Sequence, residues 1–548
     1  MNRLCKLFEQ ASDGATLTLE RGAVYHVREE DSYTLTGYYC TNTATTSQNP
    51  DGLRRVAMYL KEKKNVTVDG NGATVMVHGK MTPFLFDRCE GIAVKNLTVD
   101  YAAPTMTEFT VLSAEGKVCE VRFAPDAHFR VEDNRLFFYS DETLDGGLYW
   151  EYPANDGYRF TLWYDPVAEV TAWCGNGQFV FDAIEAIDER TLRLTFREDG
   201  HGLRAGRVIQ SRNIIRDQTG ALFQRCKDLR FEDLRIKFMH GLGMVCQFCE
   251  NITYKNCDMT PGEGRTVTST ADFFQFSGCR GKIVLDGCRA SGAQDDFMNV
   301  HGTHLRIMET DPDARSMVVR FMHNETWGIQ AFEVGDALEF IRWDTLQPYA
   351  ETVVTAWEKL SDTEIRLTLD RPLPEGIVLA RDVVENATWT PDVYVRNCDA
   401  HMIAGRGILC TTRGEVVIEN NRFYHLRGPA LVIEDDCNFW FESGYTRHIL
   451  FRNNRVDGCN YGNNYPGGPL LCYSPKVMDE ASAAYVHGKL TVDGNDFRNS
   501  FRGGTHIFHF EYLGEVELAN NVFDAPYAVT TRCSGDVSER NNTVNTMI

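Results

Sequence analysis

A short phrase recurs along this chain, and it constrains the fold more than any other feature of the sequence. Alternating apolar residues are followed by a polar residue, then by Asn, Asp or Gly, and finally by Cys, Asn or Leu. Outside two long gaps, neighbouring copies are spaced from 21 residues (521 to 542) to 41 residues (454 to 495). The last residues of the phrase are Asn71, Leu97, Leu234, Cys257, Cys288, Cys398, Asn421, Asn454, Asn495, Asn521 and Asn542. Period-two alternation at this repeat length predicts a solenoid of short strands, a parallel β-helix, in an all-β chain.

The residue that ends each phrase indicates a stack of side chains facing inward along the solenoid. Asn amides at such a position bond to the coils above and below, and Cys fills the same space as a small apolar group. This stack accounts for several of the 17 cysteines, and we expect free buried thiols in a reducing compartment. Cys246 and Cys249 form a CxxC pair with no second pair or histidine at ligand spacing, so no zinc site is expected.

The two long gaps in the repeat are rich in hairpin-like alternation. Examples are "EFTVLSAEGKVCEVRFA" in the first gap and "EIRLTLDRPL" in the second, and both predict inserted antiparallel β-barrels or sandwiches. The predicted organisation is N-terminal coils over 1–100, an inserted β domain over 101–225, central coils over 226–304, a second inserted β domain over 305–392 and C-terminal coils over 393–548. The second insertion directly follows the central coils and is expected to overhang any site there.

Composition narrows the possible partners. The formal net charge is −21, which argues against nucleic acid and anionic membrane surfaces as partners and leaves neutral ligands open. No run of apolar residues approaches the roughly 18 needed to cross a membrane. The N-terminal segment lacks the apolar core of a secretory signal, so the expected location is the cytoplasm, with secretion as the alternative if a leader has been removed from the sequence.

Three aspartates carry the chemistry that the sequence suggests. Asp272 stands 23 residues before Asp295, which is followed at once by Asp296 (295 − 272 = 23). One coil of about that length would bring the carboxylates to neighbouring strands, about 4.8 Å apart between backbones. Clustered carboxylates drive one another's pKa values apart, which supplies the acid and the base that glycoside hydrolysis needs. Aspartates also cap β-helix corners, so the pattern alone leaves both readings open.

Seven further side chains are candidates for binding a sugar: Asn299, His301, Arg265, Arg413, Glu434, Trp440 and Glu442. An indole ring matches the C–H face of galactose, and carboxylates accept hydrogen bonds from vicinal hydroxyls. Asn299 and His301 alternate along one predicted strand and so would share a face. Each of the seven also has a structural explanation as a corner, packing or surface residue. No metal ligand set is predicted, because hard and soft ligands are mixed near His301.

Several motifs together resemble glycoside hydrolase family 110, the α-1,3-galactosidases. They are "STADFFQFSGCRGKI", "QDDFMNVHG", "RGILCTTRGEVVIENNRF" and "NFWFESG", and the resemblance extends from about residue 50 to the end. It implies a right-handed β-helix with inserted β-barrels, and metal-independent, cofactor-free, inverting release of terminal α-1,3-linked galactose, as in the blood group B determinant. By similarity to the more distant family 28 polygalacturonases, Asp295 would be the general acid, and Asp272 and Asp296 would activate water. This chain has Gln275 where the family is expected to carry histidine.

Two other functions remain open from the sequence. One is a uronate-active polysaccharide hydrolase or lyase on the same fold, and the other is a non-catalytic carbohydrate-binding β-helix. A homodimer is expected from the elongated shape with two appended domains. The sequence leaves open whether fucosylated or linear α-1,3-galactosides are preferred.

Overall fold

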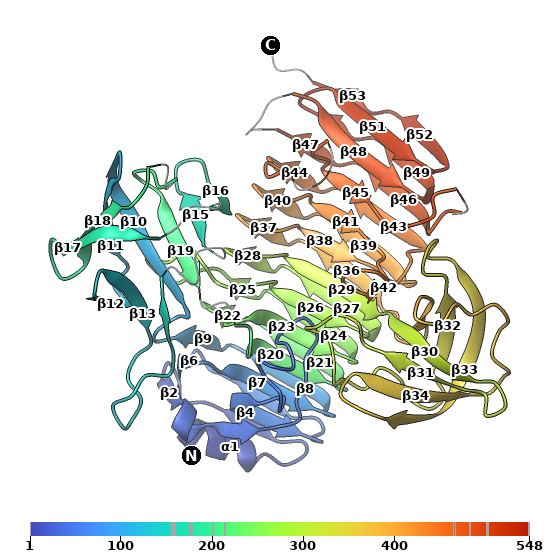
Figure 1. Cartoon of the computed structure of the whole chain (residues 1–548), viewed down its shortest axis with the longest axis horizontal. Helices are drawn as coiled ribbons and strands as arrows, with labels where there is room; N and C mark the ends of the chain where they lie inside the picture. Colours follow the sequence, from blue (N-terminus) through green and yellow to red (C-terminus); the bar gives the residue numbers. More distant parts are fainter. Residues whose placement is uncertain are drawn as a thin grey trace.

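The computed structural model describes residues 2–545 except 155–160, 175–178, 200–201, 213–214, 464, 466, 482–483 and 500–503. The described chain forms one long right-handed parallel β-helix that carries two antiparallel β domains, as Figure 1 shows. This confirms the fold expected from the repeat. Helical structure is confined to α1 (Arg3–Glu9) and the 3-10 turn η1 (Glu29–Asp31) within the described residues. None of the helices described here has the length and apolar character to cross a membrane.

Three long sheets form the faces of the β-helix. Sheet A comprises β1 (Thr16–Thr18), β5 (Thr67–Asp69), β8 (Glu90–Lys95), β21 (Lys227–Glu232), β24 (Glu250–Lys255), β27 (Arg280–Asp286), β36 (Asp392–Arg396), β39 (Glu415–Glu419), β43 (His448–Arg452), β46 (His487–Asp493), β49 (Leu513–Ala519) and β52 (Asp536–Arg540). Sheet B comprises β2 (Val24–Arg28), β6 (Thr74–His78), β9 (Thr98–Tyr101), β22 (Arg235–Ile236), β25 (Asp258–Met259), β28 (Arg289–Ser291), β37 (Asp399–His401), β40 (Arg422–Tyr424), β44 (Arg455–Asp457), β47 (Asp496–Arg498), β50 (Val522–Phe523) and β53 (Thr543–Val544).

Sheet C comprises β3 (Tyr33–Leu35), β4 (Arg54–Lys61), β7 (Thr82–Asp87), β20 (Thr219–Gln224), β23 (Leu242–Gln247), β26 (Phe274–Ser277), β29 (Met298–Thr303), β38 (Ile408–Cys410), β41 (Leu431–Ile433), β45 (Leu471–Tyr473), β48 (His506–Glu511) and β51 (Tyr527–Arg532), with β42 (Glu442–Ser443) paired to β29. Each coil runs from sheet C through sheet A to sheet B. On β26 the aromatic rings of Phe274 and Phe276 enter the core, while Gln275 faces outward.

From Leu97 onward the residues that end the repeated phrase stack inside the turn after sheet A, as predicted, whereas Asn71 is exposed and has a positive φ. Leucine and cysteine occupy this position in the first coils, from Leu97 to Cys398, and all are buried. Asparagine replaces them from Asn421 onward, and each backbone N–H and Nδ2 donates to Oδ1 of the next asparagine. For Asn421 and Asn454 these distances are 2.9 and 3.0 Å. The residue before each of these positions is often an Asn or Gly with positive φ, as at Asn256 and Asn397, and this backbone form turns the corner.

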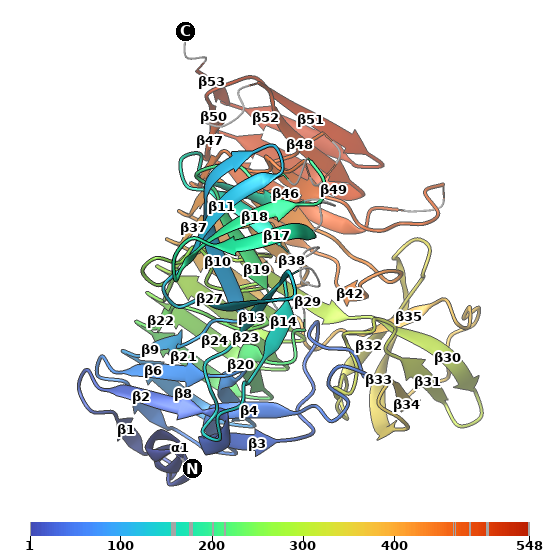
Figure 2. The same ribbon diagram turned by 60° about the vertical axis from the view of Figure 1, so that its left-hand side comes forward.

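Two antiparallel β domains interrupt the coils. The first contains the sheet β16 (Val170–Trp173), β15 (Leu162–Asp165), β19 (Val208–Arg212), β10 (Met106–Glu115), β11 (Val118–Phe123), β18 (Thr191–Phe196), β17 (Phe181–Ala186), and a smaller sheet of β12 (His128–Glu132), β13 (Arg135–Tyr139) and β14 (Glu151–Pro153). The second is a closed barrel of β30 (Leu305–Asp311), β31 (Ser316–Arg320), β34 (Glu364–Leu369), β33 (Pro348–Lys359), β32 (Ala337–Ile341) and β35 (Val383–Asn386). The two lie on different sides of the β-helix, and Figure 2 shows the first one crossing in front of the central coils.

None of the 17 cysteines, all of which lie within the described residues, forms a disulfide, and all except Cys174 and Cys533 are buried. The cysteines at the inward corner position pack as small apolar groups, as expected. The CxxC residues Cys246 and Cys249 are both fully buried in the hydrophobic core.

Candidate active site

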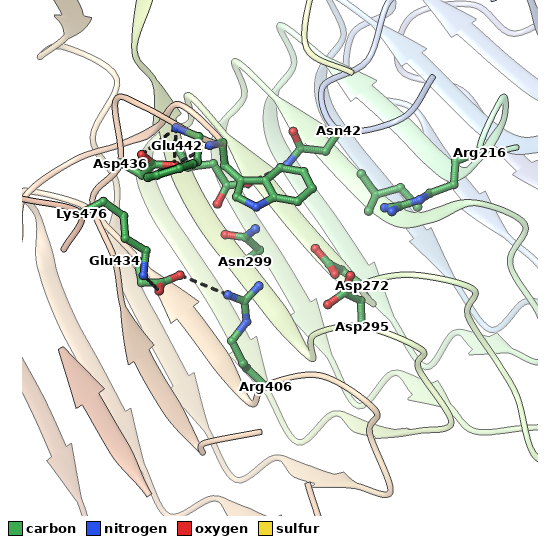
Figure 3. Close-up of a pocket in the computed structure, with 13 residues that line it drawn as sticks. Asn42, Arg216, Asp272, Asp295, Asn299, Arg406, Glu434, Asp436, Glu442 and Lys476 are labelled. Atoms are coloured by element: carbon green, nitrogen blue, oxygen red, sulfur yellow. Dashed lines mark hydrogen bonds and ion pairs between the residues drawn. The ribbon is translucent and has the colours of Figure 1, made fainter. Parts of the chain in front are cut away.

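A cavity of about 480 Å³ opens on the outer face of sheet C, over the central coils. Figure 3 shows two aspartates together at one side of this cavity, with Arg406 and Glu434 facing them. The lining residues are Asn42, Arg216, Leu242, Asp272, Asp295, Asn299, Arg406, Glu434, Asp436, Phe439, Trp440, Glu442 and Lys476. Its size falls within the range of small-molecule sites.

The floor of the cavity is formed by one position repeated on successive coils. Phe274 on β26 pairs with Met298 on β29, and Met298 pairs with Ile408 on β38. Two residues before these three partners stand Asp272, Asp296 and Arg406. Parallel pairing therefore stacks two carboxylates and a guanidinium in one row, at the spacing of neighbouring strands.

The three aspartates converge as the sequence predicted. One oxygen from each of Asp272, Asp295 and Asp296 lies within 4.8 Å of the others. The backbone N–H of Asp296 donates to Asp272 Oδ1 at 3.1 Å, which ties the two coils together. Asp272 and Asp296 are buried, whereas Asp295 is partly exposed to the cavity.

Burial and mutual repulsion separate the acidities of these groups. Burial raises the pKa of Asp272 well above its usual value, and the charges of Asp295 and Asp296 raise it further. Burial also raises the pKa of Asp296, to about 6, although the guanidinium of Arg406 opposes the shift. The pKa of Asp272 is thus raised mainly by burial and by its aspartate neighbours, whereas Arg406 limits the rise for Asp296, so the two buried carboxyls differ in acidity.

Arg406 clamps Asp296 by two routes. Its Nε lies 2.9 Å from both carboxylate oxygens, and its Nη2 lies 2.6 Å from Oδ2. Its backbone N–H also donates to Oδ1 at 2.7 Å. The coil of Arg406 approaches closely because Gly405 has no side chain: a Cβ there would meet Asp296 Oδ1 at 2.6 Å. The guanidinium extends on to Glu434 Oε2 at 3.4 Å, and Glu434 in turn holds Lys476 Nζ at 2.6 Å.

Asn299 presents an acceptor to the cavity. Its side chain is 3% exposed, and its Oδ1 is a buried atom without a hydrogen-bond partner among the residues that the structure describes. Such an oxygen suits the hydroxyl of a bound sugar, because burial without a partner is costly. His301 alternates with Asn299 on β29 but does not line the cavity. Its Nδ1 donates to the Gly302 carbonyl at 2.7 Å, so Nε2 accepts from the Gln275 amide at 3.0 Å.

Loops from distant parts of the chain form the walls. Asp436 accepts hydrogen bonds from the backbone N–H groups of Asn438, Phe439 and Trp440, which fixes the aromatic loop. The ring of Trp440 stacks on His323 of the barrel domain, with centroids 4.4 Å apart. Glu442 accepts from Asn42 Nδ2 at 2.7 Å, a contact between residues 400 positions apart.

Both arginines predicted to bind the sugar, Arg265 and Arg413, lie outside this cavity, which corrects their expected placement. Arg265 pairs with Asp126 of the first inserted domain and with Asp100, at 2.6 Å. It therefore joins the domain to the β-helix. Arg413 is buried in ion pairs with Glu339 and Glu385 on the barrel, and so it holds that domain in place. Both arginines form ion pairs with carboxylates from distant parts of the chain, and the sequence contains no pattern that indicates these pairs.

Sequence reasoning also missed cavity residues: Asn42, Arg216, Leu242, Arg406, Asp436, Phe439 and Lys476. A signal existed only for Arg406. Counting two residues back from the strand "ILC", as from "FQF" and "MNV", places it in the aspartate row. The other six, apart from Leu242, belong to loops with no repeat pattern.

Comparisons with known proteins give a consistent result. The family model "GLAA-B beta-barrel domain II" matches residues 316–384, within the barrel domain. The chain is similar to "Alpha-1,3-galactosidase A" of Bacteroides fragilis, with 34% identity over 84% of this chain and 74% of the relative. The protein of the same name from Akkermansia muciniphila is 34% identical over 88% and 77%. "Alpha-1,3-galactosidase B" of Bacteroides thetaiotaomicron is 31% identical over 91% and 78%.

Among solved structures, a family 28 exopolygalacturonase of Yersinia enterocolitica aligns with TM-score 0.35 and 9% identity, over 100% of this chain and 75% of the other. An exopolygalacturonase of Thermotoga maritima aligns with TM-score 0.29 and 11% identity, over 98% and 96%.

Proposed function

This chain belongs to the α-1,3-galactosidase family, glycoside hydrolase family 110, and from that membership we propose that it releases terminal α-1,3-linked galactose from glycans. The observation that carries the proposal is the trio of clustered aspartates, two of which line a cavity of small-molecule size. Asn299, Glu434, Trp440 and Glu442 surround that floor with hydrogen-bond acceptors and an indole face, which are the groups that a neutral sugar requires.

In the proposed reaction Asp295 is the general acid. It gives a proton to the glycosidic oxygen while the bond from that oxygen to C1 breaks. Asp272 and Asp296 activate the water that attacks C1, and the water's proton passes to this pair. Asp295 is the most exposed of the three, so a bound sugar removes water from it most. Over one turnover the proton that Asp295 gives is replaced by the proton taken from water, so the aspartate cluster ends with the protons it began with.

The stereochemical outcome is proposed to be inversion. One observation favours retention as the second candidate, because the aspartate oxygens lie within 4.8 Å of one another. Inverting pairs are usually separated by about 6.5–9.5 Å and retaining pairs by about 5–5.5 Å. A third carboxylate supports inversion nevertheless, because two groups can hold the water beside the acid. Release of β-galactose identifies inversion and release of α-galactose identifies retention.

The charges in the cavity favour a neutral substrate over a uronate. Arg406 and Lys476 both end on carboxylates, namely Asp296 and Glu434, so neither offers an uncommitted cation. Arg216 also lines the cavity, but the carboxylates in the lining outnumber the basic side chains. A uronate ligand needs cations that are free to bind its carboxylate. The substrate class is therefore proposed to be uncharged α-galactosides, including blood group B type and linear glycans.

The test is galactose release from two trisaccharides, linear Galα1-3Galβ1-4GlcNAc and its fucosylated B-type counterpart. Proton NMR of the first product gives the anomer in the same tube. Asp295→Asn is expected to abolish release, whereas the matched control Asp286→Asn keeps it. Asp286 is on the same coil but pairs with Arg396 on the outer face of sheet A. Failure of the wild type to release galactose from either compound would refute the proposed function.

A further inference from the structure

Arg406 has a set of contacts that a surface arginine does not make. It is one coil beyond Asp296 in the same row, and its fork, its Nε and its backbone N–H all converge on that one carboxylate. Asp296 is fully buried, and its two oxygens are both occupied by this clamp. Bidentate guanidinium pairs of this kind fix geometry as well as charge.

The surroundings of Asp296 contain more negative than positive charge. The titratable and charged groups that face it are Asp272 on the coil before, Asp295 beside it, and Arg406 on the coil after, with Glu434 and Tyr465 beyond Arg406 and Arg212 of β19 beside Asp295. Arg406 is the one cation in direct contact with Asp296 among the described residues. Without it, three neighbouring carboxyls would share a buried site and hold more than one proton.

We infer that Arg406 is the positioning residue of this site: its guanidinium and backbone N–H hold Asp296 as an immobile carboxylate with a fixed counter-charge, and leave Asp272 and Asp295 to face the substrate. The inference rests on the proposed function and deepens it. Asp296 then acts as a fixed negative charge beside Asp272, the member of the water-activating pair that lines the cavity. The lining of the cavity is consistent with this, since it includes Asp272 and Asp295.

The kinetic test uses Arg406→Ala, Arg406→Lys, Asp296→Asn and the double variant Arg406→Ala with Asp296→Asn. Arg406→Ala is expected to lower kcat at least about 100-fold, with a smaller change in KM, because the interaction serves the catalytic groups. The acid limb of kcat/KM should move to higher pH by about one unit or more, since a lost cation raises carboxyl pKa values. Guanidinium ion should restore part of the rate to Arg406→Ala, and Arg406→Lys should keep part of it.

The double variant separates this role from direct substrate binding. If Arg406 acts through Asp296, the double variant is no slower than the slower single variant. If instead the double variant loses the product of the two single losses in kcat, and the acid limb of the kcat/KM profile does not move, then Arg406 binds substrate independently of Asp296. That result would overturn the inference. Arg396→Ala is the matched control, because Arg396 pairs with Asp286 on the outer face of the coil that leads into Arg406. It should change neither the rate nor the pH profile.

A melting experiment tests the inference without any activity. The pKa of Asp296 is raised in the fold, so its contribution to stability is largest in acid and declines as pH rises through about 6. Removing Arg406 raises that pKa further, so the decline continues to higher pH. The fall in Tm caused by Arg406→Ala should therefore be larger at pH 8 than at pH 5, and Asp296→Asn should cancel that difference. An equal fall at both pH values would contradict the inference, even if wild type released no galactose.

Discussion

The floor and the walls of the cavity are built in different ways. The floor residues Asp272, Asp296 and Arg406 occupy one position on three successive coils, and parallel strand pairing sets their spacing. The walls come from loops, including Asn42 before β4 and the aromatic loop after β41. They meet through side-chain contacts such as Asn42 with Glu442. Strand register fixes which face of the sheet each floor side chain occupies, whereas the position of the walls depends on several independent contacts.

This difference assigns chemistry to the floor and selectivity to the walls. A shift of one residue in β26 or β29 would turn the aspartates to the wrong face, so the floor tolerates little change. Loops can change length and sequence with smaller cost to the fold. Floor variants should therefore lower kcat, and wall variants should mainly raise KM or change the preferred glycan.

After the loss of activity expected for Asp295→Asn, the largest effect is expected for Asp272→Asn. The change keeps shape and hydrogen bonding to the Asp296 N–H but removes the group that takes the water's proton. General acid–base catalysis contributes about 10²–10⁴-fold, so kcat should fall by that factor with little change in KM. Steady-state kinetics on the preferred trisaccharide measures both. A variant that retained wild-type kcat and showed only a weaker KM would place Asp272 among the wall residues.

The pH profile should report the floor alone. The pKa of Asp296 is about 6, and its ionised form is present above that value. The rate should therefore be sustained near neutrality and fall about tenfold per unit as pH drops below the limb, as expected for one essential base. Wall variants such as Trp440→Ala should share the same acid limb. A shift of the acid limb of the pH–rate profile in a wall variant would contradict the separation of the two regions.

The sequence predicted that the aspartates of the floor meet, because the repeat length sets the spacing between neighbouring coils. Alternation and corner residues specified the coils, and the interval between Asp272 and Asp295 then implied that the carboxylates meet. The same logic, applied across the barrel insertion, would have found Arg406, but an interval of 110 residues hides the register (406 − 296 = 110). Arg265 and Arg413 were misplaced because their partners, Asp126 and Glu385, lie on inserted domains whose docking has no local pattern. The wall residues could not be predicted for the same reason, because their loops also have no local sequence pattern.

Trp440→Ala sharpens the comparison from the side of the walls. The indole is 50% exposed and is held by His323, so it offers an ordered apolar surface for the sugar. Its loss should raise KM about tenfold, the effect of about 1.4 kcal/mol of lost binding, while kcat changes little. Phe439→Ala is the matched variant on the same loop. Comparing the linear and fucosylated trisaccharides in both variants shows which side chain discriminates between them.

A change in the inward stack should alter stability without altering either region of the site. Asn454 Oδ1 accepts from the backbone N–H and the amide of Asn421, and its own Nδ2 donates to the Ile418 carbonyl and to Asn495 Oδ1. Asn454→Ala leaves several buried groups unpaired and should cost about 1–3 kcal/mol of unfolding free energy. Denaturant unfolding measures the loss, and kcat per folded molecule should match wild type. A fall in kcat would show that the C-terminal coils set the register of the floor.

The smallest expected effect is that of removing divalent cations. The three aspartate oxygens lie close enough together to resemble a cation site. The floor already contains a counter-charge, because Arg406 covers both oxygens of Asp296 and the raised pKa of Asp272 keeps a proton there. EDTA should therefore leave kcat and KM unchanged, and added Ca²⁺ or Mg²⁺ should not raise them. Loss of activity in EDTA, restored by one cation, would mean that the floor is completed by a metal and that Arg406 only balances part of its charge.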